Sequence, residues 1–448
     1  MDSLLVANRG EIARRVIRTA NRLGIRTIAV HSDVDAGLPF VREADDAVEI
    51  GPAAPAESYR DADRVLAAAR KSGARAVHPG YGFLSENAAF ARRVRAAGLV
   101  WVGPDPDVIE LMGNKITARN AAAAAGIPVA PGTTAPLSDV DSAVSAAARV
   151  GYPLMVKAAA GGGGMGMAVA ADEAALRKQF AAVSAFAARM FGDAGILLER
   201  FYPDARHVEV QILGLAEGRV IALGERNCSV QRRNQKLVEE SPSPWLDPGV
   251  RERMLAAAER LGEAVGYRNA GTVECLVHGA PGAQDFVFLE MNTRLQVEHP
   301  VTELVWGLDL VEQQLLIARH RPPSVDPAAL RPRGHAIEFR VNAEDPVRFL
   351  PGPGAITQWR EPAGEGIRVD AGYAAGTKVT PAYDSLMAKL VVYGENREQA
   401  LSRARAALGS FTISGPKHNL PFFGELLEEP EFVAGTYTTA LLTRMRAR

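Results

Sequence analysis

The clearest pattern in the sequence is an alternation of polar and apolar residues that begins at Glu290 and ends at Glu298. With a period of two, one side of an extended strand receives Glu290, Asn292, Arg294, Gln296 and Glu298. The other side receives Met291, Leu295 and Val297. Residues 286–289 are apolar on both faces, which predicts that the strand begins inside the protein. A half-exposed edge strand would alternate in the same way, but a polar row that leaves a buried strand favours a functional site.

A second carboxylate strengthens this interpretation. Residues 272–277 also have the composition of a strand, and the turn-forming residues 278–284 join the two runs. A hairpin that is symmetric about Gly282 places Glu274 opposite Glu290, where the two charges repel unless a cation lies between them. With Asn292 the set offers only oxygen ligands, which predicts magnesium or manganese and disfavours zinc.

The first hundred residues predict a small doubly wound α/β domain. Short apolar strands are expected at 3–7, 26–30, 74–77 and 99–102, with an amphipathic helix over 9–23. The first turn, Ala7–Glu11, lacks the G-x-G-x-x-G fingerprint of dinucleotide-binding domains. A nicotinamide-dependent dehydrogenase is therefore disfavoured.

The remaining chain predicts three further parts. A helix is expected over 108–125, and then a small unit with strands at 152–157 and 196–199, a glycine-rich loop at 161–166 and a helix over 172–190. This unit has the size of a mobile lid. From residue 206 onward, alternating strands with helices near 247–265 and 397–408 predict an antiparallel α+β body. The expected domains are 1–103, 104–129, 130–201 and 202–448.

Composition narrows the class of protein. The 448 residues are 47% hydrophobic, which fits a multidomain globular chain, and the formal net charge of −1 gives no reason to expect nucleic-acid or membrane binding. Neither cysteine lies in a metal-binding spacing, so both are expected to be reduced thiols of a cytoplasmic protein. The sequence has no visible signal peptide and no apolar run long enough to cross a bilayer.

Several segments carry candidate phosphate chemistry. The four-glycine run is not a Walker A loop, because no Gly-Lys-Ser/Thr follows, but its backbone amides could wrap phosphate oxygens. Lys157 ends the strand that enters this loop, and Lys115 precedes the connector. Beside a magnesium site they indicate two cations for a nucleoside triphosphate. The basic run 231–236 is either a solvated face or, through its interleaved amides, an anion pocket.

These motifs together resemble biotin carboxylase, the ATP-grasp component of acetyl-CoA and related acyl-CoA carboxylases. The resemblance covers nearly the whole chain. It rests on residues 7–13, 78–87, 161–167, 225–240, 290–303, 333–336 and 342–346. It implies an ATP-grasp fold with an N-terminal Rossmann-like domain. It also implies Mg-ATP-dependent carboxylation of biotin by bicarbonate, with carboxyphosphate as the intermediate.

The resemblance also implies roles for individual residues. ATP would be bound by Lys115, Lys157, Gly163, Gly164, Glu199, Arg200, Tyr202, His207, Gln231, Asn234, Glu274 and Glu290. Magnesium or manganese would be held by Glu274, Glu290 and Asn292. Bicarbonate would be bound by Lys236, Arg294, Gln296, Val297 and Glu298, and biotin by Tyr81 and Arg340. The catalytic set would be Arg294, Lys236, Arg340 and Glu298, with Glu298 as the base.

The implied partners are a biotin carboxyl carrier protein or domain, a carboxyltransferase subunit and a second copy of the chain. No Met-Lys-Met biotinylation motif is present, so biotin is expected as a carried substrate that is not attached to this chain. Three residues depart from the family pattern: Met165 replaces a basic residue, Asn227 an acidic one and Asn234 a histidine. Another ATP-grasp ligase acting on a different carboxylate, or a nucleotide-binding protein without turnover, are the competing hypotheses.

Overall fold

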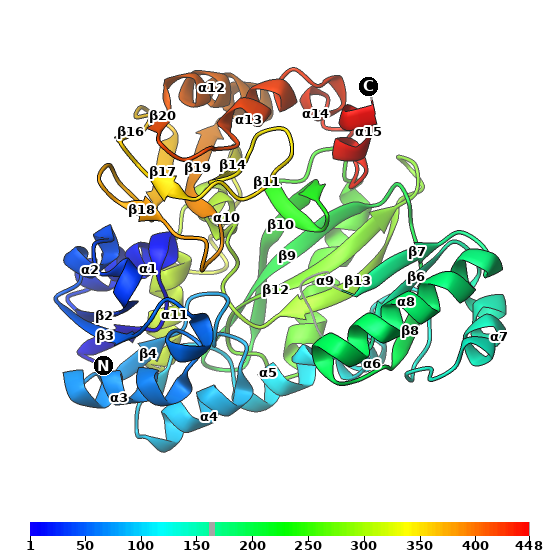
Figure 1. Ribbon diagram of the computed structural model, residues 1–448, viewed down its shortest axis with the longest axis horizontal. Coiled ribbons are helices and arrows are strands. Elements are labelled where there is room, and N and C mark those ends of the chain that lie inside the picture. The colour runs from blue at the N-terminus through cyan, green and yellow to red at the C-terminus, as the bar shows by residue number, and fades with distance from the viewer. Residues whose placement is uncertain (161–165, 448) are drawn as a thin grey trace.

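The computed structural model describes residues 1–160 and 166–447. The predicted phosphate-covering residues Gly163 and Gly164, and Met165 beside them, lie outside the described residues. In Figure 1 a large sheet lies between the N-terminal domain and a small α/β unit, with the C-terminal helices above it. Within the described ranges, no helix has the length and hydropathy needed to cross a membrane.

The N-terminal domain is a five-stranded parallel sheet in the order β3-β2-β1-β4-β5. The strands are β1 (Ser3–Val6), β2 (Arg26–Ser32), β3 (Asp46–Gly51), β4 (Ala76–His78) and β5 (Val100–Trp101). The helices are α1 (Gly10–Arg22), α2 (Pro39–Glu43), α3 (Ala62–Ser72) and α4 (Ala88–Ala96), with short 3-10 turns at Asp33–Asp35 and Pro55–Glu57. The predicted doubly wound domain is confirmed. The edge strand β3 was missed because most of its residues are only partly buried and show no clear apolar run.

The connector differs from its prediction. The single helix expected over 108–125 is two helices, α5 (Pro106–Gly113) and α6 (Lys115–Ala124). Asn114 separates them, because its extended backbone and its side chain, which accepts from the amides of Ile116 and Thr117, cap the second helix. The break turns α6 and places Lys115 at its first residue.

The small unit contains α7 (Val140–Val150), β6 (Leu154–Ala158), β7 (Met167–Ala170), α8 (Glu173–Phe191) and β8 (Ile196–Arg200). Its antiparallel sheet has the order β7-β6-β8. The apolar faces of α7 and α8 and the sheet form a separate core that includes Leu154, Phe180 and Leu198. The expected strands and helix of this unit are present, whereas α7 and β7 were not predicted.

The body is built on an eight-stranded antiparallel sheet in the order β13-β12-β9-β10-β11-β14-β19-β17. Its strands are β9 (Arg206–Gly214), β10 (Val220–Arg232), β11 (Gln235–Ser241), β12 (Asn269–His278), β13 (Asp285–Asn292), β14 (His335–Asn342), β17 (Ile367–Ala371) and β19 (Leu386–Gly394). Two small sheets pair β15 (Gly354–Ala355) with β18 (Lys378–Val379) and β16 (Gln358–Arg360) with β20 (Thr412–Ser414). The helices are α9 (Pro248–Ala264), α10 (His299–Trp306), α11 (Leu310–Ala318), α12 (Arg397–Ser410), α13 (Leu420–Leu426), α14 (Pro430–Val433) and α15 (Leu441–Ala447).

The β12–β13 hairpin has the predicted pairing of Glu274 with Glu290, but it reaches this register in a different way. The turn pairs His278 with Asp285, and a bulge at Leu289 then restores the expected alignment. The strand expected to continue to Glu298 ends at Asn292. The chain has to turn there because α10 begins at His299, with Pro300 in its first turn. Leu295 is fully buried inside this turn. Val297 was expected on the same buried face as Leu295, but it lines the cavity described below.

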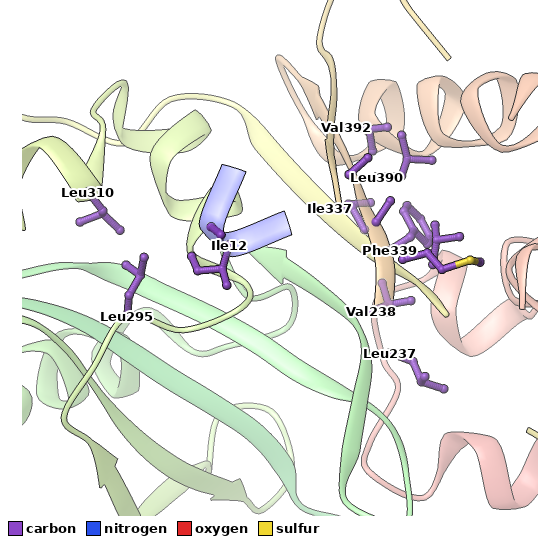
Figure 2. Close-up of a cluster of buried hydrophobic side chains, with 14 of the residues drawn as sticks. Ile12, Leu237, Val238, Leu295, Leu310, Ile337, Phe339, Leu390 and Val392 are labelled. Atoms are coloured by element: carbon purple, nitrogen blue, oxygen red, sulfur yellow. The ribbon is translucent and has the colours of Figure 1, made fainter. Parts of the chain in front are cut away.

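One hydrophobic core joins the N-terminal domain to the body. Figure 2 shows Ile12 of α1 beside Leu295 and Leu310, with Ile337, Phe339 and Leu390 on the neighbouring strands. All six side chains are at most 2% exposed and belong to one cluster. Helix α1 and the C-terminal strands therefore pack against the same core. Because Leu295 belongs to this core, the packing also holds the turn that follows β13.

The body is also held by a buried carboxylate whose removal is expected to lower stability. Glu240 of β11 is bonded to His335 (2.6 Å), Arg397 (2.7 Å) and the Tyr437 hydroxyl (2.5 Å). Burial alone would raise the pKa of Glu240, but Arg397 and His335 lower it to about 2. The folded-state pKa lies below the ordinary glutamate value, so this stabilisation is present above about pH 4.5 and is lost as the pH falls toward 2.

Glu240→Gln is therefore expected to lower the free energy of unfolding by about 3 kcal/mol at pH 7. Urea denaturation of both proteins measures the difference at pH 7 and again at pH 3, where it should be smaller. An equal difference at the two pH values would contradict this account.

Candidate active site

A cavity of about 740 Å³ opens between the small α/β unit (the predicted lid), the body sheet and the N-terminal domain. It is lined by all the described candidate residues: Tyr81, Lys115, Lys157, Glu199, Arg200, Tyr202, His207, Gln231, Asn234, Lys236, Glu274, Glu290, Asn292, Arg294, Gln296, Val297, Glu298 and Arg340. These residues come from eight strands, one helix and the connecting turns. The fold thus brings together groups that lie far apart in the sequence.

The predicted metal ligands meet at the β12–β13 pair. Glu274 and Glu290 are directly opposite each other, and Asn292 is opposite Thr272 on the same hairpin. Burial raises the pKa of Glu290, and the charge of Glu274 raises it further. Two carboxylates in cross-strand contact repel, and a hard divalent cation between them would relieve this repulsion. The donor set of these residues therefore fits magnesium or manganese.

The Asn292 amide is already engaged on both sides. Its nitrogen donates to Glu274 Oε1 at 3.0 Å, and its oxygen accepts from Arg294 at 2.7 Å. Metal coordination by Asn292 would require this oxygen to share its bond with Arg294. Glu274 also lies close to His207 and Glu209. One possible metal-ligand atom from each of these three residues lies within 4.8 Å of the others.

Lys236 lies at the centre of three carboxylates. Its ammonium group contacts Glu209 (2.6 Å), Glu298 (2.7 Å) and Glu274 (2.9 Å). Burial alone would lower the pKa of Lys236, but these carboxylates raise it well above its usual value. The lysine is therefore charged at any physiological pH, as a group that binds an anion must be.

Glu298 is a fully buried carboxylate held between cations. It accepts from Lys236 at 2.7 Å and from Arg340 at 3.0 Å. Burial alone would raise the pKa of Glu298, but Lys236, Arg340 and Arg226 lower it well below its usual value. The side chain is therefore ionised and can accept a proton from a substrate that enters the cavity.

Arg340 is oriented by a second carboxylate, that of Glu239. Its Nε donates to Glu239 at 2.6 Å, while its terminal nitrogen reaches Glu298. Burial raises the pKa of Glu239 to about 7, and the charge of Arg340 opposes this shift. The guanidinium thus joins β14, β11 and the turn before α10.

Arg294 is fixed by contacts from two domains. Its Nε donates to Glu86 of the N-terminal domain at 2.9 Å, and a terminal nitrogen donates to the Gln296 amide oxygen at 2.6 Å. Glu86 also accepts from the amide of Thr293 at 3.1 Å. These bonds hold the turn so that Arg294, Gln296 and Glu298 face the same cavity.

The opposite end of the cavity carries the predicted nucleotide contacts. Lys115 donates to the Ala158 carbonyl at 3.0 Å, and Lys157 forms an ion pair with Glu199. Burial lowers the pKa of Lys115, and the nearby charge of Lys157 lowers it further. Two lysines whose charges repel in this way are well suited to share a polyphosphate anion.

The hinge side of this end has an aromatic pair that the sequence did not indicate. Tyr202, which follows the last strand of the lid, stacks on His278 at the end of β12, with ring centroids 4.4 Å apart. Nearby, Gln231 lies 2.7 Å from His207 Nδ1. Of the two rings, Tyr202 lines the cavity, and its stacking on His278 holds it where a planar base could contact it.

Two of the three departures from the family pattern are described. Asn227 is buried and its oxygen accepts from the amide of Ser229 at 2.9 Å. Asn234 has a positive φ of 66° in the β10–β11 turn, a conformation that asparagine tolerates well, and it lines the cavity. Both amides are compatible with the local backbone.

The sequence analysis missed three carboxylates that hold the site: Glu86, Glu209 and Glu239. Glu209 carried a usable signal, because it alternates with Val208 and Val210 in the segment 208–214, whose other residues are apolar or amide. Glu239 lies three residues after Lys236, within the segment 225–240, and Glu86 lies within the segment 78–87. Their partners became visible only with the fold, since each contacts a residue on another element.

Three family models match the chain. They are described as biotin carboxylase, N-terminal domain (residues 1–109), carbamoyl-phosphate synthase L chain, ATP binding domain (114–322), and biotin carboxylase C-terminal domain (338–444). A biotin carboxylase of Halalkalibacterium halodurans is 48% identical over 98% of this chain and 97% of its own length.

Solved structures give the same result. The biotin carboxylase of Campylobacter jejuni, described as a complex with β,γ-ATP, matches with a TM-score of 0.95 and 41% identity, over 99% of this chain and 98% of its own. The biotin carboxylase domain dimer of the 2-oxoglutarate carboxylase of Hydrogenobacter thermophilus, described with MgADP, ADP and bicarbonate, matches with a TM-score of 0.94 and 41% identity, over 99% and 98%. With three family models in order, a close relative along its whole length and the ATP-grasp fold, this chain belongs to the biotin carboxylase family.

Proposed function

We propose that this protein uses Mg-ATP and bicarbonate to carboxylate biotin, with Glu298 as the base and Arg340 as the group that faces biotin. The observation that carries this assignment is the ionised, fully buried carboxylate of Glu298, which lies between Lys236 and Arg340 in the cavity that also holds the Glu274–Glu290 pair. Lys115 and Lys157 mark the nucleotide end of the cavity. Lys236, Arg294 and Arg340 mark the bicarbonate end.

The first step would form carboxyphosphate. Lys236, Arg294 and the backbone of Val297 bind bicarbonate, and Glu298 removes its proton while a bicarbonate oxygen attacks the γ-phosphorus of ATP and ADP leaves. Lys115, Lys157 and His207 orient the triphosphate, and Tyr202 with Glu199 and Arg200 contacts the base end. A metal ion held by Glu274, Glu290 and Asn292 would neutralise phosphate charge when bound.

The second step would transfer the carboxyl group. Carboxyphosphate breaks down to carbon dioxide and phosphate, and the phosphate takes the ureido proton of biotin. Arg340 stabilises the resulting enolate, whose nitrogen attacks carbon dioxide to give carboxybiotin, and Tyr81 contacts the biotin ring. The lid and the buried surroundings of the cavity keep water from carboxyphosphate.

The proposal extends to partners and location. Biotin would arrive on a carrier protein or domain, and a carboxyltransferase subunit would use the product. The chain would form a homodimer, as in the Hydrogenobacter thermophilus structure described as a dimer. A cytoplasmic location remains a prediction from the sequence.

The test of this function is ADP release in the presence of magnesium, ATP, bicarbonate and free biotin. The rate should fall to background when bicarbonate is omitted and should rise when biotin is added. A rate that depends on another carboxylic acid would support a different ATP-grasp ligase. ATP binding without any turnover would support a nucleotide-binding protein.

Glu290→Gln is expected to raise the magnesium concentration needed for half-maximal activity by about tenfold or more, because one negative ligand is lost. A magnesium titration of ADP release at fixed ATP measures this shift. Glu259→Gln, which changes a carboxylate of α9 bonded to the Ala222 amide, is the control and should keep the wild-type titration. An unchanged midpoint in Glu290→Gln would contradict its place in the metal site.

A further inference from the structure

Lys389 of β19 is a fully buried lysine that no step of the proposed reaction uses. Its side chain is 0% exposed, and its ammonium group donates to the backbone carbonyl of Val297 at 2.8 Å. The lysine does not line the cavity; it reaches the Val297–Glu298 peptide from behind. This peptide joins the backbone that would bind bicarbonate to the carboxylate that would remove its proton.

The same ammonium group pairs with Glu11 of α1 at 3.1 Å, and Glu11 is 2% exposed. Glu11 in turn accepts a hydrogen bond from the hydroxyl of Tyr81. Tyr81 lines the cavity from the N-terminal domain. A continuous chain of polar contacts thus runs from Tyr81 through Glu11 and Lys389 to Val297, and it joins the N-terminal domain to the C-terminal sheet.

The surroundings of Lys389 indicate that this arrangement is specific. On the neighbouring strands Lys389 pairs in register with Arg340 of β14 and Asp370 of β17. Asp370 is already bound by Arg368 at 2.6 Å, and Arg340 is bound by Glu239 and Glu298. Glu338, also buried, is the other carboxylate near Lys389. The direct partners of the ammonium group are therefore Glu11 and the Val297 carbonyl.

A buried ion pair adds little to stability compared with well-packed apolar groups. The contacts that this pair makes with other residues are therefore more informative than the pair itself. Here the pair ends on a turn that holds three groups of the proposed reaction. A shift of that turn by about 1 Å would move the Glu298 carboxylate relative to bicarbonate, and a displacement of this size can lower a reaction rate by about 10²-fold.

We propose that Lys389 and Glu11 are positioning residues, which fix the Val297–Glu298 peptide and connect it to Tyr81 on the biotin side of the cavity. The inference rests on the proposed function. It predicts that a substitution at Tyr81, on the biotin side, changes kcat/KM for bicarbonate, because Glu11 and Lys389 connect Tyr81 to Val297.

The experiment measures ADP release by the full chain with saturating ATP and free biotin, with bicarbonate varied. Lys389→Met keeps the volume and removes the donor to Val297. It is expected to lower kcat/KM for bicarbonate by about tenfold or more and to leave the KM for ATP within about twofold of wild type. Glu240→Gln is the matched control: it removes a buried carboxylate of the same body and lowers stability, but should leave the bicarbonate constants unchanged.

The connection to Tyr81 is tested by a double-mutant cycle. Tyr81→Phe and Glu11→Gln should each lower kcat/KM for bicarbonate, and their combination should cost less than the product of the two effects. This cycle leaves Lys389 in place, so it decides the matter even if Lys389→Met does not fold.

Independent, multiplicative effects in the cycle, or wild-type bicarbonate constants in a folded Lys389→Met, would overturn the proposal. A wild-type enzyme whose rate ignores bicarbonate and biotin would instead overturn the proposed function, before any variant is compared.

Discussion

Glu298→Gln is expected to lower the bicarbonate-dependent rate of ADP release by at least about 10²-fold, the usual contribution of a general base. The amide has nearly the shape of the carboxylate but cannot take the proton. It also removes the negative charge that faces Lys236, Arg340 and Arg226, the three cations that lower the pKa of Glu298. Nucleotide binding should persist, because Glu298 is not one of the proposed ATP contacts. Calorimetric titration with ADP and a steady-state assay separate the two effects.

The matched control for this variant is Glu303→Gln. Glu303 is a buried carboxylate on α10, one helix turn further along the chain, and its partners Arg15 (2.6 Å) and Arg368 (2.8 Å) lie away from the cavity. Its rate should stay close to that of the wild type once both proteins are shown to be folded. Equal losses in the two variants would mean that buried charge, and not proton transfer, explains the effect at Glu298.

Arg340→Ala is expected to abolish biotin carboxylation, with a loss of about 10²–10³-fold, while ATP still binds. The guanidinium is the proposed partner of the negative charge that develops on biotin, and removal of one such donor typically has an effect of this size. Its removal also leaves Glu239 without the arginine that opposes the rise of its pKa to about 7. Carboxybiotin formation with labelled bicarbonate measures the transfer, and ADP binding measures the integrity of the nucleotide end.

Two further variants sharpen the result for Arg340. Arg340→Lys keeps the charge but cannot reproduce contacts to Glu239 and Glu298 together, so it should recover only part of the rate. Arg397→Ala removes a comparable arginine bound to the neighbouring Glu240, and should carboxylate biotin normally if it folds. Normal carboxylation by Arg340→Ala would show that the role assigned to this residue is wrong.

The sequence predicted local structure well where the apolar period was strong. The opposition of Glu274 and Glu290 followed from the lengths of two strands and their turn, although a bulge at Leu289 was needed to produce it. The break between α5 and α6 was missed because the helix-forming residues 110–112 before Asn114 and the alanine-rich residues after it both favour helix, and this one capping asparagine outweighed that preference. The end of β13 was missed because polar residues continue to alternate through the turn.

The candidate site was predictable as a list of groups, but the contacts among them were not. Alternation identified Glu290 and Glu298, the magnesium site beside them indicated Lys115 and Lys157, and the resemblance supplied Arg340. The ion pairs of Lys236 with Glu209 and of Arg294 with Glu86 join elements distant in the chain. Such pairings depend on strand order and domain packing, which no local pattern in a single sequence determines.

The shared core around Ile12 has a consequence for how the molecule unfolds. Its side chains come from α1, from the turn after β13 and from β14 and β19, so neither the N-terminal domain nor the body can lose its structure without exposing apolar surface of the other. The boundary near residue 103 thus lies between two different topologies within one cooperative unit. The small unit of α7, α8 and the β7-β6-β8 sheet has a core of its own, so it is expected to unfold independently. A fragment that begins after residue 103 would lack Ile12 and its neighbours and would be expected to aggregate.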